Sequence, residues 1–200
     1  MTPSDALKCL DKGIVQKAYE FGATAAAVIP AKKITVDNNL AAGCMEPRCE
    51  NFGMSRNCPP YVSGPAAFKK LLDKFNQTIF FKIDIPSEIL FSGDRREIFQ
   101  LLHQAAAGIE KEAVKAGYSN AQAYAGGSCK DIFCHDHAEC HVLSKKGECR
   151  NPQYARPSMS GYGISVSKLF EEAGWDMNPV SQDTDTAIKM SYVCGLVLVC

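Results

Sequence analysis

Two polar stretches of this chain contain seven of its ten cysteines, and this grouping restricts its chemistry more than any other feature of the sequence. Both stretches begin with Cys-x4-Cys and end with Cys-x8-Cys, followed within three residues by a proline. The cysteines are Cys44, Cys49 and Cys58 in the first stretch and Cys129, Cys134, Cys140 and Cys149 in the second. Thiols that are grouped in this way are typical of a metal site rather than of core packing.

Disulfide bonds are one alternative, because the number of cysteines is even. The N-terminal sequence MTPSDALKCLDKG has no basic segment followed by an apolar one, which favours a cytoplasmic protein. Disulfides are rare in the reducing cytoplasm. A chain of 200 residues also buries roughly 70% of its unfolded surface, so it does not need cross-links to fold. We therefore expect clustered free thiols.

The composition excludes two classes of partner. The formal net charge is zero, which provides no general attraction to nucleic acid or to an anionic membrane surface. The longest apolar run, residues 192–200, is far shorter than the ~20 residues that span a bilayer. We expect a protein that binds neither nucleic acid nor membrane.

The periodicity of the apolar residues predicts the order of helices and strands. Helical spacing predicts helices at residues 2–22, 63–75, 94–117 and 165–174. Apolar or alternating runs predict strands at residues 24–29, 78–84, 120–125 and 186–199. The order helix, strand, cysteine loop, helix, strand therefore occurs twice.

This order predicts an α/β fold, with α+β as a variant, in which helices flank a mixed sheet. We expect a single metal-binding domain over residues 1–200, built from two similar halves at residues 1–90 and 91–200. Each cysteine loop should follow the first strand of its half, at the carboxyl end where open α/β sheets usually hold ligands.

Local signals add detail to these elements. Asp94 and Glu97 have the spacing of a capping box, with an acid in place of the hydroxyl. Ser165 is expected to cap the helix that Gly174 ends. The alternation in residues 78–84 predicts a strand with one buried face.

The spacing of the cysteines favours iron–sulfur clusters, with zinc as the alternative. Clusters are commonly held by several thiolates from one loop, often with a following proline. Structural zinc sites prefer spacings of about two to four residues, whereas the spacings here are four, five and eight. His135, His137 and His141 lie among the cysteines, and we interpret them as polar loop residues.

The two groups differ in the number of thiols. Four thiolates can hold a complete four-iron cluster, and nearby cations would balance its charge. These cations are Lys130, Lys145, Lys146 and Arg150. Three thiolates leave one iron for water, a substrate, another side chain or a distant thiolate. The spare cysteines are Cys9, Cys194 and Cys200, and the last two have the spacing of residues on one side of a strand. Ligation that is interleaved between the two groups stays open.

Several short blocks resemble a known family. The blocks are Cys58-Pro59-Pro60-Tyr61 with Phe52-Gly53 before it, Gly126-Gly127-Ser128-Cys129, Cys149-Arg150-Asn151-Pro152, and Arg156-Pro157-Ser158-Met159 leading to Gly163-Ile164. In these blocks the chain resembles the predicted metal-binding protein family, domain-of-unknown-function family 2284. The resemblance implies that all seven clustered cysteines are shared cluster ligands, in proteins of anaerobic bacteria and archaea.

Arg156 has two interpretations. Its guanidinium could donate hydrogen bonds to an anion or to cluster sulfurs. Alternatively, residues 156–159 form a turn that stiffens the entry to the following helix.

The expected function is electron transfer. We expect one or two [4Fe-4S] clusters that pass single electrons between a ferredoxin or reductase and an acceptor enzyme in anaerobic metabolism. The alternative is a zinc-stabilised interaction module without redox activity. The sequence contains no phosphate loop, no GxGxxG after a strand and no GxSxG, so it specifies no substrate and no reaction.

Overall fold

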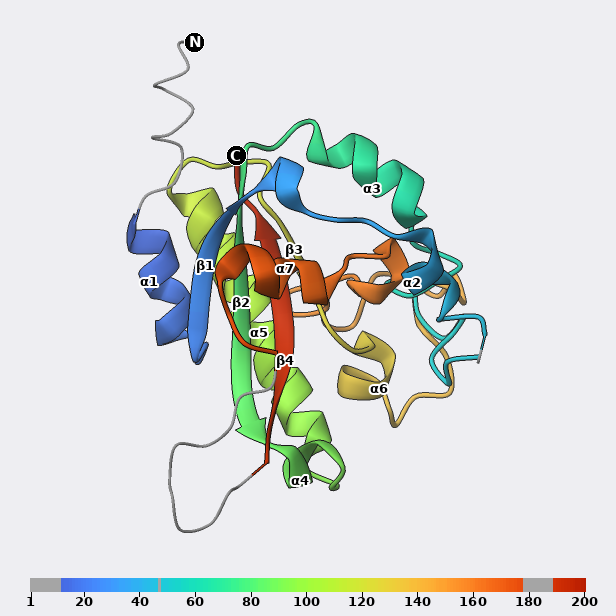
Figure 1. The fold of residues 1–200 in the computed structure, drawn as a ribbon. Helices are drawn as coiled ribbons and strands as arrows, with labels where there is room; N and C mark the ends of the chain where they lie inside the picture. The colour runs from blue at the N-terminus through green and yellow to red at the C-terminus, as the bar shows by residue number, and fades with distance from the viewer. Residues whose placement is uncertain (1–11, 47, 178–188) are drawn as a thin grey trace.

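A four-stranded sheet forms the centre of the protein, and helices cover both of its faces (Figure 1). The computed structural model describes residues 12–46, 48–177 and 189–200. The strands are β1 (Ala25–Pro30), β2 (Gln77–Pro86), β3 (Gln122–Ala125) and β4 (Met190–Leu198), and they lie in the order β1-β2-β4-β3. The expected α/β class, with helices flanking a sheet, is confirmed. All three strand pairings are antiparallel, whereas the sequence predicted a mixed sheet.

Four longer helices divide between the two faces of the sheet. Helices α1 (Lys12–Glu20) and α5 (Arg95–Lys115) supply the core of one face, and α3 (Gly64–Leu72) and α7 (Val166–Ala173) supply that of the other. The shorter helices are η2 (Ala31–Lys33), α2 (Asn38–Ala42), α4 (Ser87–Leu90), α6 (Cys129–Phe133) and η3 (Ser160–Tyr162). No helix of the described ranges is long and apolar enough to cross a bilayer.

The central strands are buried on both faces because helices cover both. In β2, Phe81 belongs to the core beneath α1 and α5, and the adjacent Phe80 belongs to the core beneath α3 and α7. Neither phenylalanine is exposed to solvent. Burial of one such side chain contributes about 1.5–3 kcal/mol. The prediction that this strand has one buried face is therefore wrong, although its position is confirmed.

The antiparallel sheet changes how the cysteine stretches meet. Strand β1 pairs with β2, β2 with β4 and β4 with β3, all antiparallel, so β1 and β3 run in opposite directions. Their carboxyl ends therefore point to opposite ends of the sheet, and the two cysteine stretches would be separated if each stayed at its strand end.

Residues 31–37 bring the first stretch across to the second. Ile34 and Val36 are buried in the core beneath α3 and α7, and Val36 forms a bridge with Ile164. This segment leads to α2, and the chain then enters the first cysteine stretch beside α6 (Figure 1). The twofold order of elements occurs in the described residues as expected. The similarity of the halves 1–90 and 91–200, and their union in one domain, stay predictions.

The predicted caps of α7 are confirmed, whereas the capping box predicted at the start of α5 is wrong. Ser165 Oγ accepts a hydrogen bond from the Lys168 amide at 3.4 Å, and Gly174 ends α7 in the left-handed conformation, both as expected. Asp94 makes no side-chain capping bond, because its own backbone has already adopted the helical conformation. An N-cap residue needs an extended backbone to direct its side chain at the amides of the first turn.

Gly163→Ala is expected to lower the free energy of unfolding by at least about 2 kcal/mol. Gly163 has φ of +67°, and a Cβ there would overlap the backbone carbonyl oxygen of Asp37. The Asp37 amide also donates to the Gly163 carbonyl at 2.8 Å, so the two backbones cannot separate freely. Gly174→Ala is the matched control, since Gly174 has φ of +69° with no heavy atom within 4 Å of its Cβ position. Denaturant unfolding that shows equal losses for both variants would contradict the prediction.

Candidate metal centre

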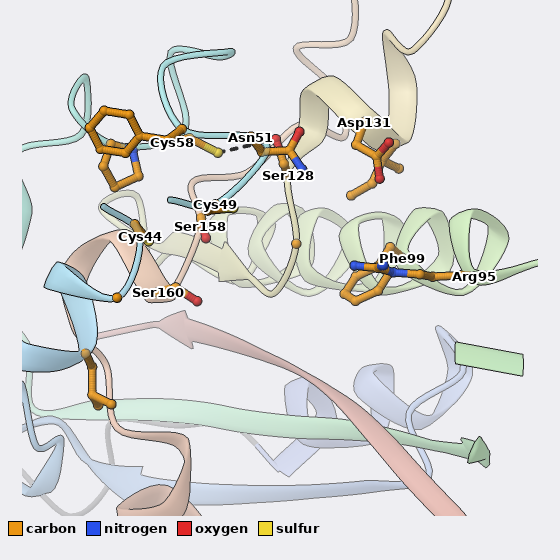
Figure 2. Close-up of a pocket in the computed structure, with 16 residues that line it drawn as sticks. Cys44, Cys49, Asn51, Cys58, Arg95, Phe99, Ser128, Asp131, Ser158 and Ser160 are labelled. Carbon is orange, nitrogen blue, oxygen red and sulfur yellow. Dashed lines mark hydrogen bonds between the residues drawn. The ribbon is translucent and has the colours of Figure 1, made fainter. Parts of the chain in front are cut away.

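The clustered cysteines line two neighbouring cavities. Cys44, Cys49 and Cys58 line a cavity of about 360 Å³, shown in Figure 2. The second cavity measures only about 20 Å³, and the cysteines that line it are Cys129, Cys134, Cys140 and Cys149. The cavities therefore group the seven thiols as the sequence does, three and four, while Cys58 also lies close enough to Cys129 and Cys140 to interact with them electrostatically. Their role as ligands stays a prediction.

The thiols of the larger cavity face side chains from two helices. In Figure 2 the three cysteines lie on one side, and Asp131 of α6 and Phe99 and Arg95 of α5 lie on the other. Gly127 also lines this cavity and has φ of +83°. A Cβ at this position would lie 2.7 Å from Phe99 Cδ1, so a glycine is needed for the chain to pass the ring.

Burial and mutual repulsion raise the pKa of two thiols of the larger cavity, Cys44 and Cys58, which makes these two hard to ionise without a cation. Burial raises the pKa of Cys44, and charges on Cys49 and Cys58 would raise it further. Burial also raises the pKa of Cys58, partly offset by hydrogen bonds with Ser128 and Ser55. A metal ion or cluster removes this cost because it binds the thiolate and displaces the proton.

Two thiols of the smaller cavity, Cys129 and Cys140, differ in how well the protein stabilises their charge. Burial raises the pKa of Cys129 to about 11. For Cys140, burial acts in the same direction, but the backbone amides of Arg56, Leu143 and Val142 and the charge of Arg150 outweigh it and lower the pKa. Donors that are already directed at a sulfur favour its thiolate form, which is the form that binds metal.

Side-chain donors surround the sulfurs of the smaller cavity. Ser55 Oγ lies 3.4 Å from Cys129 Sγ, and Asn57 Nδ2 donates to the same sulfur at 3.5 Å. Asn151 Nδ2 donates to Cys134 Sγ at 3.5 Å, and the Asn151 amide donates to Cys149 Sγ at 3.4 Å. Residues of the first cysteine stretch therefore complete the surroundings of the second group.

Another contact links a cysteine of the first stretch to a residue beside the second stretch. The Cys58 thiol donates to Ser128 Oγ at 3.3 Å, and Ser128 directly precedes Cys129. The two cavities thus share a wall that is formed by both cysteine stretches. The sequence analysis missed Ser55, Asn57 and Ser128 as sulfur partners, and the only available signal was their place beside the cysteines.

The histidines and cations of the second cysteine stretch lie partly at the smaller cavity and partly at the surface. His141 lines the smaller cavity and its Nδ1 lies 3.1 Å from the Glu148 carbonyl oxygen. His135 Nε2 lies 2.9 Å from Asp136, and His137 is exposed. Lys130 and Arg150 line the smaller cavity, while Lys146 pairs with Glu139 at the surface. The described positions of His135 and His137 agree with their interpretation as polar loop residues.

Arg156 supports the loops and does not face either cavity. Its guanidinium forms an ion pair with Glu110 of α5 at 2.5 Å and also donates to the carbonyls of Pro152 and Ala155. Glu110 accepts in addition from the Ala123 amide at 2.7 Å. The described contacts therefore support the turn interpretation rather than donation to a cluster.

Buried His103 joins this turn to the loop of Cys129. Its Nδ1 accepts from the Arg156 amide at 3.2 Å, so its Nε2 carries the proton and donates to the Gly126 carbonyl at 3.2 Å. Burial lowers the pKa of His103 to about 4, which keeps the ring neutral. The sequence analysis missed His103 and Glu110, because each looks like an ordinary member of a long helix.

In the described part of the chain, the cysteines outside the two stretches line neither cavity, and Cys200 is disulfide-bonded. Cys194 is buried in the core beneath α3 and α7, whereas Cys200 packs against the opposite core. The expectation that these two face one side is wrong, because β4 ends at Leu198 and the alternation stops there. Cys9 lies outside the described residues.

The donor set can hold a metal centre. All seven candidate ligands are thiols, which suit both iron–sulfur clusters and zinc. Among the residues that the structure describes, no three His, Cys, Asp or Glu side chains are already gathered around a point where one ion would bind. The three- and four-cysteine cavities are the places where these residues would hold a centre.

Comparison with known proteins identifies the family. No curated protein and no solved structure matches the chain significantly. The family model described as "Predicted metal-binding protein (DUF2284)" matches residues 27–199, a range that contains all seven cysteines of the two cavities. The chain therefore belongs to this family of predicted metal-binding proteins.

Proposed function

We propose that the protein is an iron–sulfur protein with a [4Fe-4S] cluster at each of the two cavities and that it transfers single electrons. The observation that supports this proposal most strongly is the grouping of four and three cysteines around adjacent cavities with a shared wall. A ferredoxin or reductase would supply the electrons, and an acceptor enzyme in anaerobic metabolism would take them.

The four-cysteine cavity suits electron transfer alone. Its four thiols would occupy all four irons of a cluster, which leaves no iron for a substrate. The donors from Ser55, Asn57 and Asn151 would stabilise the added negative charge after reduction.

The three-cysteine cavity has space beside its thiols. Three thiols would leave one iron without a cysteine, and the cavity of about 360 Å³ falls in the range of small-molecule sites. The Cys58–Ser128 and Ser55–Cys129 contacts bring the two centres together. One centre would therefore exchange electrons with the partner protein, and the other would hold an exchangeable ligand.

Anaerobic purification with a visible spectrum and metal analysis tests the proposal. We expect a brown protein with iron and acid-labile sulfide in equal amounts, corresponding to two four-iron clusters. The alternative is a zinc-stabilised interaction module, which the position of His141 beside four thiols supports. A colourless protein with stoichiometric zinc would establish that alternative and end the electron-transfer proposal.

Asn57→Ala is expected to lower the reduction potential of the four-cysteine cluster by about 40 mV. The change removes a donor to Cys129 Sγ, and one hydrogen bond is worth about 1 kcal/mol, which corresponds to ~40 mV for a one-electron couple. A redox titration followed by electron paramagnetic resonance measures the potential. Asn120→Ala is the control, because Asn120 is exposed and lines neither cysteine cavity. An unchanged potential in Asn57→Ala would contradict the assigned role.

A further inference from the structure

The side of the larger cavity that faces the thiols carries two opposite charges. Arg95 comes from the first turn of α5 and Asp131 from the first turn of α6, and both line the cavity across from the cysteines (Figure 2). Neither side chain belongs to an ion pair among the residues that the structure describes, and in particular they do not pair with each other. Both side chains are exposed to solvent, so a ligand that enters the cavity can reach the two charges.

Arg95 is held in a suitable orientation by its own helix. Its guanidinium carbon lies 5.5 Å from the centroid of the Phe99 ring, one turn further along α5. This cation–π contact keeps the guanidinium near the ring and leaves its N–H groups available to bind a carboxylate with two hydrogen bonds. Arg95 therefore supplies a site for one carboxylate at the cavity.

Asp131 determines what else the ligand must carry. Its carboxylate would repel a ligand that has only negative charge, and it would attract an ammonium group at the same cavity. Neutral polar groups also line the cavity, namely Asn51 and the hydroxyls of Ser128 and Ser158, together with apolar side chains such as Leu40 and Ile132. The cavity therefore matches a small molecule with a negative and a positive end better than it matches a simple anion.

We propose that this cavity binds a small zwitterion, a free α-amino acid, with its carboxylate on Arg95 and its ammonium group on Asp131. The ligand would lie beside the centre held by Cys44, Cys49 and Cys58, so the inference rests on the proposed function of that site. The cavity volume of about 360 Å³ leaves space for an amino acid together with a cluster.

Equilibrium dialysis under anaerobic conditions tests the binding, with protein whose iron content has been measured first. The probe is a mixture of the twenty common amino acids, and the retained ones are identified and quantified by chromatography. We expect at least one amino acid to be retained in stoichiometric amount. Propionate and ethylamine, which carry one charge each, should bind at least tenfold more weakly than that amino acid, because each leaves one charged side chain without a partner.

Matched variants assign the binding to the two side chains. Arg95→Gln and Asp131→Asn should each weaken binding about tenfold or more, while the protein keeps its iron and its circular dichroism spectrum. Arg96→Gln and Glu97→Gln are the controls, since these exposed neighbours in α5 do not line the cavity, and their binding should be unchanged.

Three results would overturn the inference. They are iron-loaded protein that retains no amino acid, propionate that binds as tightly as the retained amino acid, and Arg95→Gln protein with unchanged affinity. All three leave the iron content intact, so they differ from the failure of the proposed function, in which the protein contains no iron.

Discussion

Cys140→Ala is expected to remove about half of the iron from anaerobically prepared protein, because one of two four-iron clusters would lose a ligand. Cys140 is the thiol whose charge the protein stabilises most clearly, through three backbone amides and Arg150. The cluster at the larger cavity should persist, since Cys140 does not line that cavity. Iron analysis and electron paramagnetic resonance of the reduced protein measure both outcomes.

Two comparisons make this result decisive. Cys44→Ala should have the complementary effect, with loss of the other cluster, because Cys44 lines only the larger of the two cysteine cavities. Cys194→Ala should lose no iron, since Cys194 is buried in the core and lines neither of these cavities. If Cys140→Ala and Cys44→Ala each abolished both clusters, the ligation would be shared between the groups and the separation into two centres would be wrong.

Arg156→Ala is expected to lower the free energy of unfolding by about 3–5 kcal/mol, the usual effect of breaking a buried ion pair. Arg156 and Glu110 have side-chain exposures of 14% and 20%, so removal of the guanidinium leaves a carboxylate largely buried without its partner. The variant also loses the contacts that hold the turn at Pro152 and Ala155. Denaturant unfolding measures the change.

A second substitution separates the charge from the packing. Glu110→Gln in the Arg156→Ala background should recover part of the stability, because a neutral amide costs less to bury than a carboxylate. Lys168→Ala serves as the surface control. It breaks an exposed pair with Glu171 and should change stability by less than about 1 kcal/mol. A loss below about 1 kcal/mol in Arg156→Ala would show that the pair does not support the turn.

Local patterns in the sequence were sufficient for the strands and the longer helices of the described residues and for the grouping of the thiols. The predicted residues 2–11 and 186–188 lie outside the described residues, and the short helices α2, α4 and α6 were not predicted. The strand at residues 78–84 and the helix that Ser165 caps depend on neighbouring residues, and both occur where the spacing predicted them. The separation into three and four cysteines is also local, because short spacings keep the members of each stretch close together. The family resemblance rested on short sequence blocks beside the cysteines and at residues 156–164. The family match over residues 27–199 confirms it.

The tertiary structure decided everything that depends on which distant segments meet. The direction of β3 relative to β1 follows from the pairing with β4, which no short pattern encodes. Contacts such as Asn57 with Cys129 and Arg156 with Glu110 join residues 72 and 46 positions apart. The placement of Arg95 and Asp131 at one cavity likewise depends on how α5 packs beside α6. The sequence by itself determined which atoms are available to bind a metal, because that is a property of residue type and local spacing. Only the packed chain determined what surrounds those atoms, because that depends on long-range pairing and burial.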